Sequence, residues 1–423
     1  MPENMEKSSS TTRRAFLAGP AAAGAAFTII RPELVRGWAP EKLKIGLVGC
    51  GGRGTQAVEN AMAADPAVVL TAMADAFEDR LEGSLKRLRS LPIQDRIQVD
   101  PEHRFVGFDA YQKLIHSGVD VVFLCTPPGW RPLHFEACVE AGKHVFMEKP
   151  FGVDPVGVRR VMEAGRKSVE KKLTVVSGAQ RRSDPFYLEN VDAIRNGKLG
   201  EVVALYAYWI GTPVIQQRNG RNPKWGEFEW QHRNWYSNLW LCGDQIVEQH
   251  LHNIDVCCWI MGGPPSSVVA SGGAAWRPVG DEIYGNIYDH ISADFEWPNG
   301  VRMSSYCRQY PQGCYQQVNE IVAGSKGRMT LNQTRGGPGY VNEHVKLYRS
   351  IRGDGPYINE TQAVAESTMT CIMGRESAYS GMKITWDMIM NSKQDLMPKA
   401  EQYTYDLKVE PTPFPVPGKY KFI

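Results

Sequence analysis

A glycine-rich turn constrains the fold of this chain more than any other feature. It lies between an apolar segment and a segment of mixed polar and apolar residues. Residues 44–48 have the composition of a short buried strand, and residues 55–64 that of a helix. Between them stand Gly49, Gly51 and Gly54 in the spacing G-x-G-x-x-G. This order is typical of dinucleotide-binding domains, because the backbone N–H groups at the helix start face a pyrophosphate. We therefore predict a doubly wound parallel sheet near the amino end.

The residues of this turn have distinct predicted roles. Gly49 makes the tight turn, Gly51 lets the backbone approach the pyrophosphate, and Gly54 lets the helix pack closely on the strand. Gly52 and Arg53 complete the turn. We count all five among the cofactor-binding residues.

A second apolar segment, residues 68–74, ends in an acid, Asp75. Its spacing from the glycine turn is close to that of the acid that binds the adenosine ribose in such domains. A carboxylate there accepts hydrogen bonds from both ribose hydroxyls and repels a 2′-phosphate, so we predict NAD as the cofactor. Arg53 and Arg80 lie near enough in sequence to leave NADP as an alternative.

Two further apolar segments, residues 119–125 and 144–147, predict buried strands of the same parallel sheet. Ligands bind beyond the carboxyl ends of such strands, so the residues that follow are predicted to line the cofactor site. Together with one residue of the helix predicted at 132–141, they are Thr126, Pro127, Glu148, Lys149 and His134. Pro150 keeps Lys149 out of a helix, and we predict that the Lys149 ammonium reaches the reactive end of the cofactor.

From about residue 174 the pattern changes to short alternating segments. Five of them predict strands, at residues 200–210, 288–297, 301–310, 317–323 and 328–331. Pro298-Asn299-Gly300 and Gly324-Ser325-Lys326-Gly327 are turn sequences that join neighbouring strands into antiparallel hairpins.

These patterns predict an α/β fold with two domains. A Rossmann domain occupies residues 41–170, and an α+β domain built on a mostly antiparallel open sheet occupies residues 171–423. A signal and linker occupy residues 1–40. The charged segments 218–234 and 333–365 are expected to be inserted loops.

One segment, residues 243–259, predicts a helix with a polar stripe beside its apolar one. On a helical period the polar stripe consists of Glu248, His252, Asp255 and Trp259. A carboxylate one turn from an imidazole can orient it, so we predict His252 as a general base that Glu248 orients. A structural histidine is the alternative. His250 and His252 lie about 200° apart on a helix and cannot share an ion, so we predict no metal site.

An aromatic stretch precedes this segment. It contains Trp225, Trp230, Trp235, Tyr236 and Trp240. Flat aromatic faces suit sugar rings, and they equally suit a dimer interface. We predict that Trp235 and Tyr236 bind substrate, with the interface as the alternative.

The amino-terminal segment has the layout of an export signal. Arg13-Arg14 precede a weakly apolar run rich in Ala and Gly, residues 15–30. This predicts a twin-arginine signal and a periplasmic location. A membrane anchor is the alternative, although the run is short for a span of roughly 20 residues. An uncleaved signal would tether the protein to the membrane.

Composition limits the partners. The formal net charge of +2 gives no reason to expect nucleic acid or an anionic membrane as a partner. The nine cysteines include no Cys-x-x-Cys pair. The spacing allows a disulfide between Cys307 and Cys314, but spacing alone does not determine which cysteines pair.

Three of these motifs together resemble the glucose–fructose oxidoreductase/inositol dehydrogenase family, called Gfo/Idh/MocA. They are the glycine turn, Glu148-Lys149-Pro150, and the carboxylate-x3-His-x2-Asp pattern at residues 248–255. The resemblance spans the chain from about Lys42 to its end. It implies a Rossmann domain followed by a mostly antiparallel α/β domain whose open sheet builds dimers or tetramers.

The resemblance also implies roles for single residues. Lys149 and His252 would flank the nicotinamide and the reacting carbinol, and Arg182 would bind substrate or stabilise the pocket. Glu248, one methylene longer, stands where the family usually has Asp. The chain is also similar to exported family members, which include NAD-dependent α-N-acetylgalactosaminidases.

We therefore predict hydride transfer between a sugar carbinol and the nicotinamide. His252, alone or with Lys149, takes the hydroxyl proton, while Lys149 stabilises the alkoxide. Asp255 binds a second hydroxyl or orients His252. Export away from any free NAD pool favours a tightly bound cofactor that each cycle regenerates. Two alternatives stay open: glycoside cleavage through transient oxidation, elimination and re-reduction, and a non-catalytic NAD-binding protein.

Overall fold

The computed structural model describes residues 42–332 and 337–423. The described residues belong to one compact unit. The predicted export signal, residues 1–40, lies outside the described residues. Within the described ranges no helix is long and apolar enough to cross a membrane.

The first sheet is parallel throughout. Its strands lie in the order β3 (Arg104–Val106), β2 (Val68–Asp75), β1 (Leu43–Val48), β4 (Val121–Leu124), β5 (His144–Met147) and β6 (Val175–Ser177). The strand order reverses between β1 and β4, and open α/β sheets bind ligands at such a point. β6 completes this sheet, so the sheet extends beyond the boundary predicted at residue 170.

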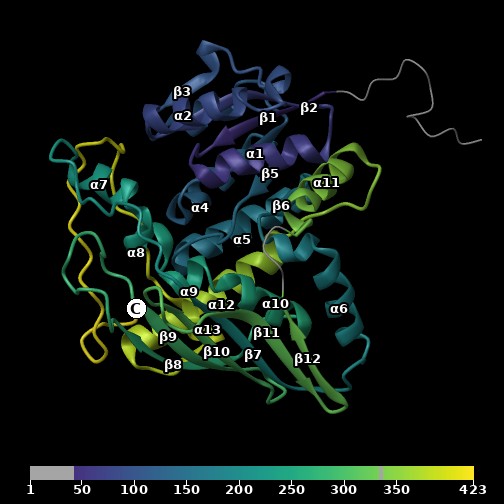
Figure 1. Ribbon diagram of the computed structural model, residues 1–423, viewed down its shortest axis with the longest axis vertical. Helices are drawn as coiled ribbons and strands as arrows, with labels where there is room; N and C mark the ends of the chain where they lie inside the picture. Colours follow the sequence, from purple (N-terminus) through teal and green to yellow (C-terminus); the bar gives the residue numbers. More distant parts are fainter. Residues whose placement is uncertain (1–41, 333–336) are drawn as a thin grey trace, which may run out of the picture. The chain divides into compact units, whose positions relative to one another are not determined.

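Helices cover both faces of this sheet, as predicted for its continuous apolar strands (Figure 1). On one face lie α1 (Gly52–Ala64), α2 (Glu78–Arg89) and α11 (Gly339–Arg352). On the other lie α3 (Ala110–Ile115), α4 (Arg131–Glu140) and α5 (Pro155–Glu170). Figure 1 shows α11 beside α1, although the two are far apart in sequence.

The second sheet is mostly antiparallel and confirms the predicted fold class. Its order is β12 (Gly327–Leu331), β11 (Gln317–Gly324), β7 (Val202–Gly211), β10 (Arg302–Gln309), β9 (His290–Glu296), β8 (Ser267–Gly273) and β13 (Ile384–Thr385). Only β7 and β10 pair in parallel among these strands. Alternate residues of β9 and β10 are buried, so one face of the sheet packs inward. Both predicted hairpins are present.

Further helices complete the fold. They are α6 (Pro185–Arg195), α7 (Glu227–Arg233), α8 (Leu239–Cys242), α9 (Gln245–Glu248), α10 (Leu251–Met261), α12 (Thr361–Ser380) and α13 (Trp386–Asn391). Short 3-10 turns are η2 (Gln94–Arg96), η3 (Pro101–His103), η4 (Pro128–Trp130), η5 (Gln180–Ser183) and η6 (Trp235–Ser237). The long α12 is buried along most of its length and contacts α5, α10 and β8. Its buried Arg375 donates to the carbonyls of Val153 at 2.6 Å and Gly243 at 3.1 Å, which joins the two halves of the chain.

Three local predictions were wrong. The segment 333–365 is not an inserted loop, because it contains α11, and 218–234 contains α7. Polar residues of α11 misled the prediction, since Glu343 and His344 are buried inside the protein rather than solvated. The helix predicted at 243–259 is divided into α9 and α10.

All nine cysteines lie within the described residues and are free. Cys307 is buried on β10 while Cys314 is exposed, so the disulfide that the spacing allowed does not form.

Candidate active site

A cavity of about 630 Å³ opens at the carboxyl ends of β1, β2, β4 and β5. Both halves of the chain form its walls. Among the predicted site residues, those that line it are Gly49, Gly51, Gly52, Arg53, Gly54, Asp75, Thr126, Pro127, His134, Glu148, Lys149, Trp235, Glu248 and His252. Three predicted substrate ligands, Arg182, Tyr236 and Asp255, are not part of this lining.

The glycine turn has the geometry of a phosphate cradle. Gly49 adopts a φ of +96°, and a Cβ there would lie 2.6 Å from the backbone nitrogen of Thr126. A Cβ on Gly54 would lie 2.0 Å from the carbonyl oxygen of Gly49. Gly51 and Gly52 have open space where a Cβ would stand. The turn therefore leaves its backbone N–H groups accessible at the start of α1, which suits a pyrophosphate.

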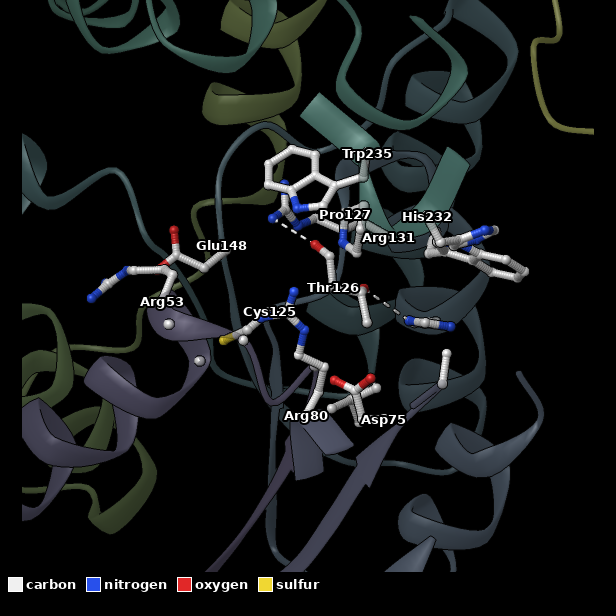
Figure 2. A pocket seen from close by; sticks show the side chains of 18 of the residues that line it. Arg53, Asp75, Arg80, Cys125, Thr126, Pro127, Arg131, Glu148, His232 and Trp235 are labelled. Carbon is white, nitrogen blue, oxygen red and sulfur yellow. Dashed lines mark hydrogen bonds and ion pairs between the residues drawn. The ribbon is translucent and has the colours of Figure 1, made fainter. Parts of the chain in front are cut away.

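Asp75 lies at the end of β2 and lines the cavity beside Arg80 (Figure 2). Its carboxylate accepts the N–H groups of Cys50 at 2.6 Å and Phe77 at 2.9 Å. Burial raises the pKa of the Asp75 carboxyl, and the hydrogen bonds from Phe77 and Cys50 lower it by less. Its position fits the ribose-binding acid that the sequence predicted.

A buried arginine that the sequence analysis missed holds the ends of two strands together. Arg131 donates to the carbonyl of Thr126 at 2.9 Å and to that of Pro150 at 2.5 Å (Figure 2). Burial lowers the pKa of Arg131 to about 10. His134 lies 3.3 Å from the Thr126 hydroxyl, and burial lowers its pKa to about 3, so its imidazole is neutral. These contacts fix Thr126 and Pro127 beside the cofactor groove.

Lys149 reaches the cavity from the end of β5, and Glu248 holds it there. The ammonium lies 2.9 Å from Oε1 of Glu248 and donates also to the Glu248 carbonyl. The second carboxylate oxygen accepts from Gln249 at 2.6 Å. Glu248 therefore contacts Lys149 and Gln249 rather than orienting His252, contrary to the sequence prediction, and the regular helical hydrogen bonding is interrupted between α9 and α10.

His252 lies at the start of α10 with only 7% of its surface exposed, and it lines the same cavity as Lys149. Its Nδ1 is buried and has no hydrogen-bond partner among the described residues, so Nε2 is the nitrogen available to a ligand. Its ring stacks on Trp209, with 5.7 Å between centroids. Burial, and then the charge of Lys149, lowers the pKa of His252 well below its usual value of 6.5. A neutral imidazole and an ammonium thus face one cavity.

Comparison with known proteins agrees with this geometry. A model described as an oxidoreductase family with an NAD-binding Rossmann fold matches residues 43–176, and a GFO/IDH/MocA C-terminal domain model matches residues 187–330. The chain belongs to the Gfo/Idh/MocA family. It is an NAD-binding oxidoreductase, and the cradle at the start of α1 fits that cofactor.

Relatives of this Gfo/Idh/MocA member include inositol dehydrogenases. The myo-inositol 2-dehydrogenase of Thermotoga maritima is 25% identical over 296 residues, which cover 69% of this chain and 76% of that protein. The inositol 2-dehydrogenase of Rhizobium meliloti is 26% identical over 275 residues, which cover 63% of this chain and 74% of that protein. The structure of scyllo-inositol dehydrogenase from Lactobacillus casei with bound NAD(H) and scyllo-inositol shares the fold. Its TM-score is 0.64 at 19% identity, over 82% of this chain and 99% of that one.

A buried network fixes the backbone of His252 in this Gfo/Idh/MocA protein. Arg181 donates to the His252 carbonyl at 3.1 Å and forms an ion pair with Glu320 of β11. Glu320 also accepts from Asn253 and, at 3.1 Å, from Tyr187. No local sequence pattern marks Arg181 or Glu320, and the predicted substrate ligand was the neighbouring arginine, Arg182.

Loss of Glu320 tests this network. Glu320→Ala leaves the Arg181 guanidinium buried without its carboxylate, and we expect the free energy of unfolding to fall by about 3–5 kcal/mol. Urea denaturation followed by circular dichroism measures it. The double variant Arg181→Met, Glu320→Met removes both charges and is expected to recover most of the loss. A single variant as stable as the wild type would show that the pair contributes nothing.

Arg182, Asp255 and Tyr236 do not line the cavity and contact other residues of the protein, which is compatible with the alternative that Arg182 stabilises the pocket. Arg182 forms a two-pronged ion pair with Asp255, at 2.8 and 2.7 Å, in which both carboxylate oxygens take part. The hydroxyl of Tyr236 accepts from Gln309 at 2.6 Å in the interior. Only Trp235 of the predicted aromatic pair faces the cavity, so it alone keeps the predicted role of a sugar platform.

The α11 helix, which lies beyond the matched regions, adds a wall that the sequence analysis did not foresee. Arg53 pairs with Glu148 and, at 2.9 Å, with Glu343 of α11. Its guanidinium lies 4.9 Å from the ring centre of Tyr340, which lines the cavity. Two carboxylates, those of Glu148 and Glu343, therefore face Arg53. The ion pair with Arg53 holds the side chain of Glu148, the residue before Lys149.

Proposed function

We propose that the protein oxidises a carbinol of a neutral ring polyol or sugar, with NAD as hydride acceptor, or catalyses the reverse reduction. One observation carries the proposal: Lys149 and His252 face the same cavity as the glycine turn. The named relatives, which act on inositols, support a polyol as substrate. Two of the cations that line the cavity, Arg53 and Lys149, each have a carboxylate partner, which favours an uncharged substrate beside them.

The residues divide the proton chemistry between them. Neutral His252 accepts the hydroxyl proton of the substrate at Nε2, and Lys149 donates a hydrogen bond to the oxygen as its negative charge develops. Glu248 holds the Lys149 side chain in place. Bound NAD supplies the acceptor for the hydride that leaves the carbinol carbon. The substrate loses two electrons and two hydrogens in total, one as the hydride and one as the proton on His252.

The pH dependence follows from the lowered pKa of His252. The base is active when neutral, so kcat/KM is retained as the pH falls through 6.5 and is lost only near the lower pKa. Lys149→Met removes a cation that lowers this pKa, so NMR titration of the imidazole should show the pKa of His252 moving upward in that variant. If kcat/KM of the wild type falls on the acid side with a midpoint at or above pH 6.5, the assignment of His252 as the base is wrong.

Replacement of the base gives a second test. His252→Asn should lower kcat/KM by about 10²–10⁴-fold.

Purified protein tests the function directly. The protein is mixed with NAD and a panel of inositols, free sugars and glycosides, and the near-ultraviolet absorbance of NADH is followed. Formation of NADH with a neutral polyol supports the proposal. Release of an aglycone with no net NADH would instead establish the glycosidase alternative, which the named relatives do not support.

Four further proposals rest on the sequence. We propose export by the twin-arginine route, a periplasmic location, a tightly bound cofactor that is recycled, and a homo-oligomer. Arg13-Arg14 and the apolar run after them carry the first two. Replacing both arginines with lysines and fractionating the cells tests them, because the protein should then remain in the cytoplasm. Size-exclusion chromatography with light scattering tests the oligomer.

A further inference from the structure

The C-terminal half of the chain reaches the adenosine end of the NAD groove. His232 and Arg233, at the end of α7, line the cavity together with Asp75 and Phe77 of the Rossmann domain. Figure 2 shows His232 on the opposite side of the view from Glu148, the residue before Lys149. Dinucleotide-binding domains bind the adenosine ribose at the acid after the second strand, which is Asp75 here.

Arg233 is fixed to the Rossmann domain by charge and by ring contacts. Its guanidinium donates to both carboxylate oxygens of Asp79, at 3.1 and 3.0 Å, and to Glu229 at 2.7 Å. It also lies 4.1 Å from the ring centre of Phe77 and 4.8 Å from that of Trp225. The Arg233 side chain is 12% exposed, whereas that of Asp79 is 62% exposed. The pair therefore joins α7 to the first turn of α2, just beyond Asp75.

The C-terminal tail adds a second connection at the same place. The Tyr405 hydroxyl donates to the carbonyl of Ala76, the residue after Asp75. Its ring packs on Phe108 at 5.3 Å and on Phe77 at 5.9 Å. Tyr405 lies beyond the regions matched by the family models, so this contact belongs to a part of the chain that those models do not describe.

We propose that α7, through His232 and Arg233, covers the adenosine half of the NAD site, and that the Arg233–Asp79 ion pair controls the entry and release of the dinucleotide. α7 closes this end of the groove beside Asp75, the proposed ligand of the ribose, and Tyr405 fixes the adjoining backbone at Ala76. The cofactor leaves this end only after Arg233 separates from Asp79. The proposal rests on NAD binding, which the family shows, and does not depend on the identity of the substrate.

Asp79→Asn is the sharpest variant, because the exposed carboxylate tolerates replacement and does not line the cavity. Stopped-flow fluorescence of NADH gives the association and dissociation rate constants separately. If the pair controls access, both rate constants rise by about threefold to fivefold, since the open state is more populated with and without ligand, and Kd changes little. Salt should accelerate both steps in the wild type but not in the variant. Glu59→Gln, which removes a surface partner of Arg87 on the same domain, is the matched control.

Each outcome decides the proposal. Unchanged rate constants in Asp79→Asn would overturn it. A faster dissociation with an unchanged association rate would also overturn it, because Arg233 would then be a simple contact of the bound nucleotide. Faster association and faster dissociation in Asp79→Asn, with little change in Kd, would support it. Because NADH binding is measured without substrate, failure here leaves the proposed dehydrogenase reaction untouched.

Discussion

Lys149→Met is expected to lower kcat by about 10²–10³-fold, because it removes the donor aimed at the oxygen on which charge develops. Binding of NAD should change little, since the glycine turn and Asp75 remain. Steady-state kinetics with a substrate found in the panel measures kcat, and NADH fluorescence measures binding. Lys113→Met is the control, since Lys113 is an exposed lysine of α3 that does not line the cavity.

The variant also leaves Glu248 without its ammonium partner, so a structural effect must be separated from a catalytic one. The double variant Lys149→Met, Glu248→Gln removes that unpaired charge. If the double variant is as stable as the wild type and still inactive, the loss belongs to the chemistry. A kcat within threefold of the wild type in either variant would remove Lys149 from the mechanism.

Gly54→Ala is expected to weaken NAD binding by at least about tenfold and to destabilise the fold by about 1–3 kcal/mol. The new Cβ would lie 2.0 Å from the Gly49 carbonyl oxygen, so α1 must move away from the turn that presents its N–H groups. Calorimetric titration with NAD and thermal unfolding measure the two effects.

Gly83→Ala is the matched glycine control. Gly83 lies inside α2 with nothing within 4 Å of a new Cβ, so alanine there should leave NAD affinity unchanged. It should stabilise the protein slightly, by about 0.5–1 kcal/mol, because alanine favours a helix. Equal NAD affinity of Gly54→Ala and the wild type would show that close packing at this turn is not needed for binding.

The Rossmann half was predictable because its signals are local. A continuous apolar strand, a glycine turn and a helix each depend on neighbouring residues, and Asp75 and Lys149 follow directly from strand ends. The antiparallel hairpins were predictable for the same reason, since a short turn sequence fixes each pair.

The contacts within the site were less predictable because they join distant segments. Helical spacing suggested that Glu248 meets His252, yet Glu248 pairs with Lys149, which lies 99 positions away in the sequence. Arg181 meets Glu320 across 139 positions of the sequence, and Arg53 meets Glu343 across 290. Charged residues that pair in the interior look solvated in the sequence, which is why α11 was mistaken for a loop.

The most direct test of the account follows a hydrogen atom. A polyol that reduces NAD is prepared with deuterium on its reacting carbinol carbon, mixed with the enzyme in ordinary water, and the nicotinamide product is analysed by mass spectrometry. If the enzyme transfers hydride, the deuterium appears on the reduced cofactor, and Lys149→Met slows this transfer. Deuterium that is lost to water, with none on the cofactor, would contradict hydride transfer in this cavity.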